Sequence, residues 1–170
     1  MRNVAVDVPM NTSLYVFDCE WVGDMSCPHT VHLTEIAVYS VRTGANYYAT
    51  CTPLASDNAV STGRSLIGLP ATSVCTGTSC TAALAGMLQF VENDTAEGAA
   101  FPTFVAHNGI RYDAPVLLHS MRKCNLAIPS QWRVMDSLHH ARFHLRHRNL
   151  TTKFGLAQLC ETLGVEVDRT

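Results

Sequence analysis

The sequence contains no uninterrupted run of about 18 or more apolar residues, so no segment is predicted to cross a membrane as a helix. The opening stretch, MRNVAVDVPMNTS, has neither a continuous apolar region nor a small-residue cleavage site, and we predict no signal peptide. Internal repeats and low-complexity tracts are also missing. The 170 residues, 47% hydrophobic and 15% charged, are typical of one globular domain with its own core.

A CxxC pair is absent as well. The seven cysteines are odd in number and scattered, at positions 19, 27, 51, 75, 80, 124 and 160. This pattern argues against a disulfide framework and indicates reduced thiols, so we predict an intracellular location, in the cytoplasm or the nucleus. Cys75 and Cys80 could bind zinc together with histidines elsewhere, although no matching second pair of ligands is visible.

The whole chain has no large excess of charge, but its C-terminal part is locally rich in basic residues. The net charge is −2, yet 9 of the 12 Lys and Arg residues lie from Arg111 onward. The segment HHARFHLRHRNLTTK (139–153) holds four His, three Arg and one Lys without an acid. Such a basic segment is a candidate surface for phosphates. The alternative is an ordinary solvated surface.

The apolar patterning predicts an α/β domain over residues 13–170, preceded by a loose lead-in at 1–12. Alternating and β-branched stretches indicate strands at 13–19, 30–40 and 46–52, which we expect to form an antiparallel meander. Short strands are predicted at 103–106 and 133–135. Residues 53–79 are rich in Ser, Thr, Gly and Pro and indicate a long irregular connection.

Helical periodicity is found at 81–91, where Ser79 or Thr81 is the expected N-cap. Further helices are predicted at 111–124 and at 154–163, the latter ended by Gly164. The alternation of strands and helices predicts a mixed five-stranded sheet flanked by helices. Carboxylates at the ends of its central strands would then gather at one rim.

Two acids lie at the end of the first predicted strand, in FDCEWVG. Residues i and i+2 of a strand point to the same face, so Asp18 and Glu20 are expected side by side. Two carboxylates in an apolar strand are costly unless a cation neutralises them, and paired carboxylates suit Mg²⁺ or Mn²⁺. The alternative, two solvent-facing acids on an edge strand, fits less well with the apolar LYVF before them.

A second group of polar residues lies in FVAHNGIRYDAPVLL (104–118). The predicted strand ends at His107-Asn108-Gly109, where the glycine is expected to supply a special turn conformation. Asp113 follows at the start of an apolar helix and is expected to face the same rim. Alternatively, Asp113 before Ala114-Pro115 acts only as a helix cap.

Together the two segments resemble the first two signatures of the DEDD-superfamily 3′→5′ exonucleases. The second is most similar to the three-prime repair exonucleases, of the His-type branch, which carry VAHNG-x-RYD-x-P-x-LL. VMDSL (134–138) and KFGLAQLCETLGV (153–165) also resemble segments of that family, so the similarity extends from about Leu14 to Val165.

The resemblance implies a ribonuclease-H-like fold and a two-metal hydrolysis of phosphodiester bonds at the 3′ end of DNA, with RNA as a further possible substrate. Asp18, Glu20 and Asp113 match three of the four carboxylates that bind two Mg²⁺ or Mn²⁺ ions. Candidate contacts to a single-stranded or 3′-ended nucleic acid are Trp21, His107, Asn108, Tyr112, Arg142, Arg146 and Arg148. For Trp21 and Tyr112 the alternative role is packing in the core.

The chain departs from the family in two places. The third signature, a His with an Asp five residues later, is expected after KFGLAQLCETLGV, but only VDRT (167–170) comes near that point, and Asp168 is too early. The first signature has Trp21-Val22-Gly23 where many relatives have Thr-Thr-Gly. We therefore expect either a domain truncated at its C-terminus or a natural short form without catalysis.

Two other functions remain open from the sequence. One is a catalytically inactive nuclease-fold module that binds nucleic acid or protein. The other is a different ribonuclease-H-like enzyme, such as an oligoribonuclease. The fold alone does not choose among these, because one fold hosts many functions.

Overall fold

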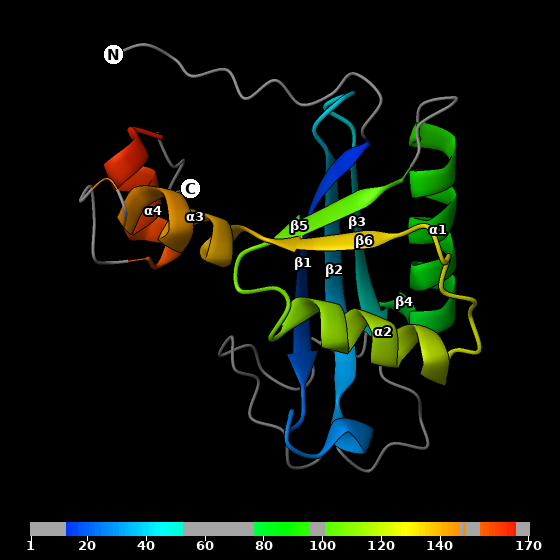
Figure 1. Cartoon of the computed structure of the whole chain (residues 1–170). Coiled ribbons are helices and arrows are strands. Elements are labelled where there is room, and N and C mark those ends of the chain that lie inside the picture. Colours follow the sequence, from blue (N-terminus) through cyan, green and yellow to red (C-terminus); the bar gives the residue numbers. More distant parts are fainter. Residues whose placement is uncertain (1–12, 53–76, 96–100, 147, 149–153, 166–170) are drawn as a thin grey trace.

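Three antiparallel strands form the centre of the sheet in the computed structural model, which describes residues 13–52, 77–95, 101–146, 148 and 154–165. They are β1 (Leu14–Val22), β2 (His32–Ser40) and β3 (Asn46–Thr52) (Figure 1). The predicted meander is therefore confirmed. A bulge interrupts the pairing of β1 with β2, since Glu20 lies opposite Glu35 and Trp21 opposite Leu33.

Two parallel strands extend the sheet on the other side of β1. β5 (Thr103–Ala106) pairs with β1, and β6 (Arg133–Asp136) pairs with β5. At the opposite edge, the two-residue strand β4 (Thr78–Ser79) pairs with β3, which gives the order β4-β3-β2-β1-β5-β6. The mixed sheet is as predicted, with this short sixth strand added.

The predicted helices are present with small shifts at their ends. They are α1 (Cys80–Asp94), α2 (Asp113–Lys123) and α4 (Leu156–Leu163). The hydroxyl of Ser79 accepts a hydrogen bond of 3.2 Å from the N–H of Ala82, so Ser79 is the N-cap of α1. Gly164 ends α4 with φ 69°, in the left-handed region that glycine tolerates best.

One helix was not predicted. α3 (Ser137–Arg146) lies within the stretch that we interpreted only as a basic segment. Its apolar signal is weak because only Leu138 and Leu145, seven residues apart, are buried along it. A single 3₁₀ turn, η1 (Pro28–Thr30), lies between β1 and β2. No helix in the described part of the chain is long and apolar enough to span a membrane.

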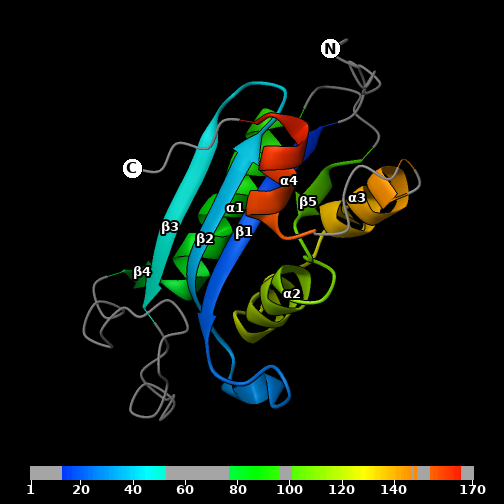
Figure 2. The ribbon, with the colours of Figure 1, turned by 90° about the vertical axis from the view of Figure 1, so that its left-hand side faces the viewer.

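The helices lie on both sides of the sheet. α1 is on one side of β1–β3, whereas α3 and α4 are on the other (Figures 1 and 2). The core fills the space between the sheet, α1 and α2, with Tyr15, Ile36, Leu84, Met87 and Val116 fully buried. On α4 only Leu159 is buried, while Leu156 and Leu163 are exposed. The α1 side therefore holds the main core.

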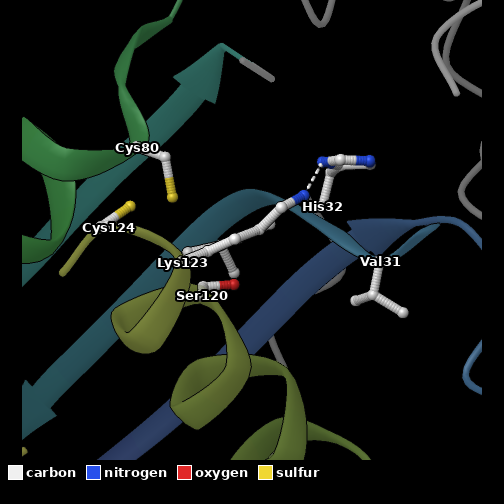
Figure 3. A pocket seen from close by; sticks show the side chains of 7 residues that line it. Val31, His32, Cys80, Ser120, Lys123 and Cys124 are labelled. Carbon is white, nitrogen blue, oxygen red and sulfur yellow. Dashed lines mark hydrogen bonds between the residues drawn. The ribbon is translucent and has the colours of Figure 1, made fainter. Parts of the chain in front are cut away.

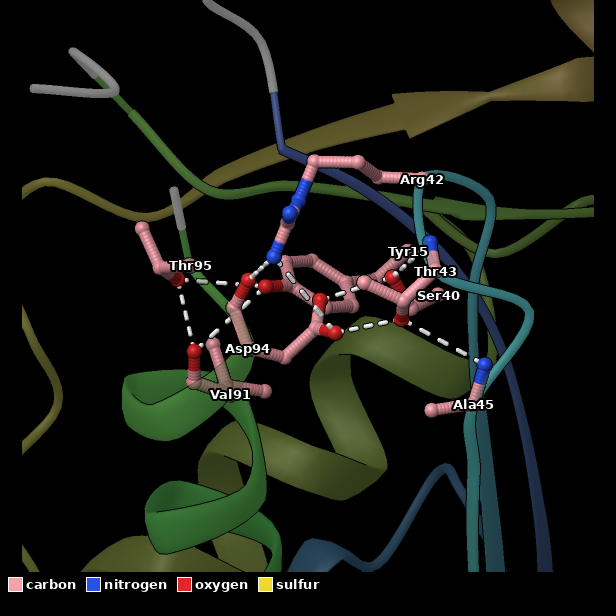
Figure 4. A network of polar contacts seen from close by, with 8 residues as sticks. All are labelled: Tyr15, Ser40, Arg42, Thr43, Ala45, Val91, Asp94 and Thr95. Atoms are coloured by element: carbon pink, nitrogen blue, oxygen red, sulfur yellow. Dashed lines mark hydrogen bonds and ion pairs between the residues drawn. The ribbon is translucent and has the colours of Figure 1, made fainter. Parts of the chain in front are cut away.

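A polar network fixes the C-terminal end of α1 to the β2–β3 turn (Figure 4). The carboxylate of Asp94 accepts hydrogen bonds from the hydroxyls of Ser40, at 2.6 Å, and Thr43. Arg42 forms an ion pair with Asp94, with 3.7 Å between Nη2 and Oδ1. Burial alone would raise the pKa of Asp94, but these hydrogen bonds and Arg42 lower it below its ordinary value.

All six cysteines in the described part of the chain are free thiols. Cys80 and Cys124 border a cavity of about 20 Å³ between β2 and α2, where Lys123 Nζ lies 3.0 Å from His32 Nδ1 (Figure 3). A hydrogen bond from Cys80 lowers the pKa of the buried Cys51 thiol. The cavity is the size of one water molecule. Cys75 of the zinc alternative, residues 53–76 of the predicted connection and the lead-in at 1–12 lie outside the described residues. The end of the connection predicted at 53–79 is not irregular, because Thr78 and Ser79 form β4.

Candidate carboxylate site

The candidate site forms where β5 separates from β1. The pairing of the two strands covers Leu14 to Val16 of β1 and ends there. Further along the same strand, the backbone N–H of Cys19 donates a hydrogen bond of 3.0 Å to Oδ1 of Asp113. The side chain of Asp113, at the start of α2, thus lies beside the part of β1 that is not paired with β5.

Asp18 and Glu20 flank Cys19 and point to the opposite face of the sheet. Cys19 is buried in the core at 2% exposure, whereas Asp18 is exposed and Glu20 half-buried. Glu35 lies directly across from Glu20 on β2 and accepts a hydrogen bond of 2.9 Å from the hydroxyl of Tyr48. The predicted side-by-side arrangement of Asp18 and Glu20 agrees with this alternation.

The carboxylates influence one another electrostatically. Burial raises the pKa of Glu20, and the neighbouring charges of Asp18, Glu35 and Asp113 raise it further. Burial also raises the pKa of Asp113, with the charge of Asp18 adding to it and the hydrogen bond from Cys19 opposing it. Burial is thus the main cause of both raised pKa values, and the nearby carboxylates add to it.

Asp113 does not act as the cap of its helix, so the alternative interpretation of this residue is wrong. Tyr112 occupies the N-cap position of α2 and makes no side-chain cap hydrogen bond. Asp113 is the first helical residue, is 5% exposed, and directs its carboxylate to β1. The side chain therefore joins the two sequence segments that carry the acids.

The site does not form a closed set of metal ligands in the described residues. Within that part of the chain, no three His, Cys, Asp or Glu side chains are arranged so that they could hold one ion. The donor type still suits a hard divalent cation, because carboxylate oxygens are the ligands that Mg²⁺ and Mn²⁺ prefer. The rim thus supplies the right chemistry but not a completed coordination sphere.

Asp136 organises the site's surroundings and was missed by the sequence analysis. It ends β6, is 4% exposed, and accepts backbone N–H groups of Asn108 and Ile110 at 3.0 and 3.2 Å. It also accepts the N–H of Leu138 at 2.9 Å and so caps α3. Its charge contributes to the raised pKa of Asp113. An acid between a short strand and a polar helix, in VMDSL, was the available signal.

The turn between β5 and α2 contains the predicted contacts His107 and Asn108. His107 Nδ1 lies 3.2 Å from the hydroxyl of Ser137, and Asn108 adopts a left-handed φ of 61°. The special conformation was expected at Gly109 instead, which is wrong. Gly109 is needed for a different reason, since a Cβ there would lie 2.4 Å from Cβ of Ala106. Both predicted residues thus help to form the turn.

Two aromatic rings lie next to the acids. Trp21 and Tyr112 stack with 6.2 Å between ring centroids and 20° between planes, and the Arg111 guanidinium lies 5.2 Å from the Tyr112 centroid. Trp21 also packs against the core. Its indole Nε1 is buried and has no hydrogen-bond partner in the described structure. Both rings are half-buried, so the packing role expected for Trp21 applies to part of its surface.

The predicted basic contacts are further along the chain. Arg142 is exposed on α3, Arg146 is the last residue of that helix, and Arg148 is exposed in the following turn. His147 and the segment 149–153 lie outside the described residues. The structure joins this region to the site through Asp136, which bonds both the 108–110 turn and α3.

Comparison with known proteins identifies the fold. Among solved structures, product-bound exonuclease I matches 93% of the chain with a TM-score of 0.68 and 15% identity. E. coli exonuclease I in complex with a dA16 oligonucleotide matches 91% with a TM-score of 0.63 and 14% identity. Cell-death related nuclease 4 (CRN-4) matches 92% with a TM-score of 0.64 and 15% identity. The predicted ribonuclease-H-like fold is confirmed by these structural neighbours.

The chain spans only part of these neighbours, 40% of the product-bound exonuclease I chain, 36% of the dA16 complex and 57% of CRN-4. No known family profile matches the sequence. No curated protein matches it either. At identities this low the likeness shows the fold, so the activity must be argued from the site itself.

Proposed function

We propose that the chain carries the catalytic carboxylates of a metal-dependent 3′→5′ exonuclease that acts on DNA, with RNA as a second possible substrate. The observation that supports this proposal best is the bond between Cys19 and Asp113, at 3.0 Å. It brings an acid from the second signature beside the two acids of the first, Asp18 and Glu20. Structural neighbours that are exonucleases support the same class of reaction.

In this proposal Asp18, Glu20 and Asp113 bind two Mg²⁺ or Mn²⁺ ions. When bound, such ions would activate a water molecule and stabilise the leaving 3′ oxygen. The raised pKa values of Glu20 and Asp113, caused by burial first and by neighbouring carboxylates second, are compatible with a cation at this rim, because a positive charge would favour their ionised forms. The proposal requires the exposed Asp18 and the half-buried Glu20 to move toward Asp113 when an ion binds.

The nucleic acid would approach from the side of the aromatic pair and α3. Stacked aromatic rings bind unpaired bases with little sequence preference, and Trp21 and Tyr112 offer such a surface beside the acids. Arg142, Arg146 and Arg148 would contact phosphates. The single-stranded oligonucleotide in the exonuclease I complex supports this class of partner.

One observation favours a second candidate, a nuclease-fold module that binds nucleic acid or protein without cleaving it. The three acids do not form a ligand set for one ion in the described residues.

The proposal is tested with single-stranded DNA labelled at the 5′ end and incubated with the full chain and Mg²⁺ or Mn²⁺. We expect a ladder that shortens from the 3′ end, and we expect Asp18→Asn and Asp113→Asn to abolish it. Asp24→Asn is the matched control, because this acid is exposed in the β1–β2 loop and its carboxylate accepts a local hydrogen bond from the N–H of Ser26.

Immediate release of the 5′ label as a short product would contradict degradation in the 3′→5′ direction. Degradation that survives both substitutions would contradict the assignment of the acids. Binding of the DNA without any degradation would support the second candidate instead.

A further inference from the structure

Two histidines on α3 lie one helical turn apart with their rings in contact. The ring centroids of His140 and His144 are 4.3 Å apart, with 51° between the ring planes. Both side chains are exposed. Residues i and i+4 lie on the same face of a helix, which is the spacing at which two helical histidines bind one metal ion.

The packing of α3 keeps this pair directed away from the protein. Leu138 and Leu145 are buried at 6% and 8% exposure, and at 3.6 residues per turn they lie on a different face of the helix, roughly 130° around the axis from the two histidines. Anchoring by these leucines fixes which side of α3 meets solvent. The imidazoles are therefore displayed on a defined helical surface.

Phe143 further restricts one of the two rings. Its ring packs edge-on against His144, with 5.0 Å between centroids and 85° between planes. His144 is thus contacted by His140 on one side and by Phe143 on another. A ring that is partly held before an ion arrives loses less conformational entropy on binding.

We propose that His140 and His144 form a binding site for a borderline divalent transition ion, Zn²⁺ or Cu²⁺. Neutral imidazole nitrogens suit these ions, with bonds of ~2.0–2.1 Å to Zn²⁺, which small side-chain rotations would allow from the observed ring contact. Water completes the coordination, since the described residues supply no third ligand. The affinity is therefore moderate.

This site differs in chemistry and position from the carboxylate rim. Imidazole nitrogen selects Zn²⁺ or Cu²⁺, whereas carboxylate oxygen accepts Mg²⁺ and Mn²⁺. The inference does not depend on nuclease activity, because it rests on α3 alone. If the chain also binds nucleic acid through Arg142, a bound ion would add positive charge to the same helix.

The test is isothermal titration of the full chain with Zn²⁺ in a large excess of Mg²⁺, which occupies oxygen sites and competes poorly for nitrogen. We expect one Zn²⁺ site, and we expect His140→Gln and His144→Gln each to weaken it by at least about tenfold. His139→Gln is the matched control, because it is exposed on the same helix but lies off the face shared by the pair.

Histidine NMR spectra give a second measurement, in which the ring signals of His140 and His144 should shift with Zn²⁺ while that of His139 stays in place. Equal loss of affinity in all three variants would overturn the proposal. So would unchanged binding in both His140→Gln and His144→Gln.

Discussion

The carboxylate of Asp113 lies 3.0 Å from the backbone nitrogen of Cys19, 94 residues earlier in the chain. This bond forms beyond the end of the β1–β5 pairing, where β1 has no strand partner on that side. It places the start of α2 beside the strand that carries Asp18 and Glu20. The carboxylate rim is therefore built by tertiary structure from two segments that are far apart in the sequence.

Asp136 holds together the turn that leads to this rim. Asp136→Ala should lower the free energy of unfolding by about 2–3 kcal/mol, because the buried N–H of Leu138 on α3 and the partly buried N–H groups of the 108–110 turn lose their acceptor. Urea denaturation measures the change. Asp136→Asn keeps one acceptor oxygen and should cost less. A loss in Asp136→Ala no larger than in Asp136→Asn would argue against this role.

The raised pKa values of Glu20 and Asp113 predict how stability depends on pH. The folded chain holds these protons at pH values where the unfolded chain has released them, so the stabilisation is complete below the ordinary carboxyl pKa of about 4. It is lost as pH rises through the raised pKa values. The free energy of unfolding contributed by this site should therefore fall as pH rises above about 4.

Urea denaturation across this pH range, with and without Mg²⁺, measures the effect. Mg²⁺ should restore stability at neutral pH, and Glu20→Gln should show a smaller fall with pH than the unchanged chain. Asp94 has the opposite effect, because its pKa is lowered in the folded chain. The stability that it contributes is present above the ordinary pKa of an Asp carboxyl and is lost as pH falls below that pKa. Stability that rises from pH 4 to 7 in Glu20→Gln and in the unchanged chain alike would contradict the prediction.

Arg142 and Arg148 should contribute to nucleic-acid binding through charge. Alanine at either position should weaken binding of single-stranded DNA and reduce the slope of log affinity against log salt by about 0.7 for each lost phosphate contact. Fluorescence anisotropy at several salt concentrations gives the slope. Arg122→Ala, in the last turn of α2, is the control and should leave the slope unchanged. Equal salt slopes in all variants would show that the DNA strand binds away from Arg142 and Arg148.

Asp94 should stabilise the fold without a part in the chemistry. Asp94→Ala removes the acceptor of the Ser40 and Thr43 hydroxyls and the partner of Arg42, and it should cost about 2–3 kcal/mol of unfolding free energy. Thr43→Ala removes one of these bonds and should cost about 1 kcal/mol. Thermal or urea denaturation compares the two. Indistinguishable stabilities for the two variants would contradict the prediction that Asp94 makes more than one stabilising contact.

Local patterns in the sequence predicted most of the fold. The alternating apolar residues of β1–β3 face a core on one side, so their period is clear. Ser79 and Gly164 mark helix ends through chemistry that belongs to single residues. Features of this kind can be found without knowing the tertiary structure.

The features that sequence reasoning missed depend on contacts between distant segments. α3 has only two buried leucines, so its helical period is hidden among histidines and arginines. Asp136 acquires its role from N–H groups of the 108–110 turn, about 26 residues away, and no local pattern shows them. Asp113 has the local pattern of a cap, but its partner is Cys19 on β1. Tertiary contacts decided these cases.

The central claim, that Asp18 and Asp113 belong to one metal site, is tested most directly by Mn²⁺ binding. Electron paramagnetic resonance of free Mn²⁺ should show binding by the unchanged chain and by Asp24→Asn, with a loss of at least about tenfold in affinity for Asp18→Asn and for Asp113→Asn. Equal Mn²⁺ affinity in all four proteins, or no binding by the unchanged chain, would contradict the account.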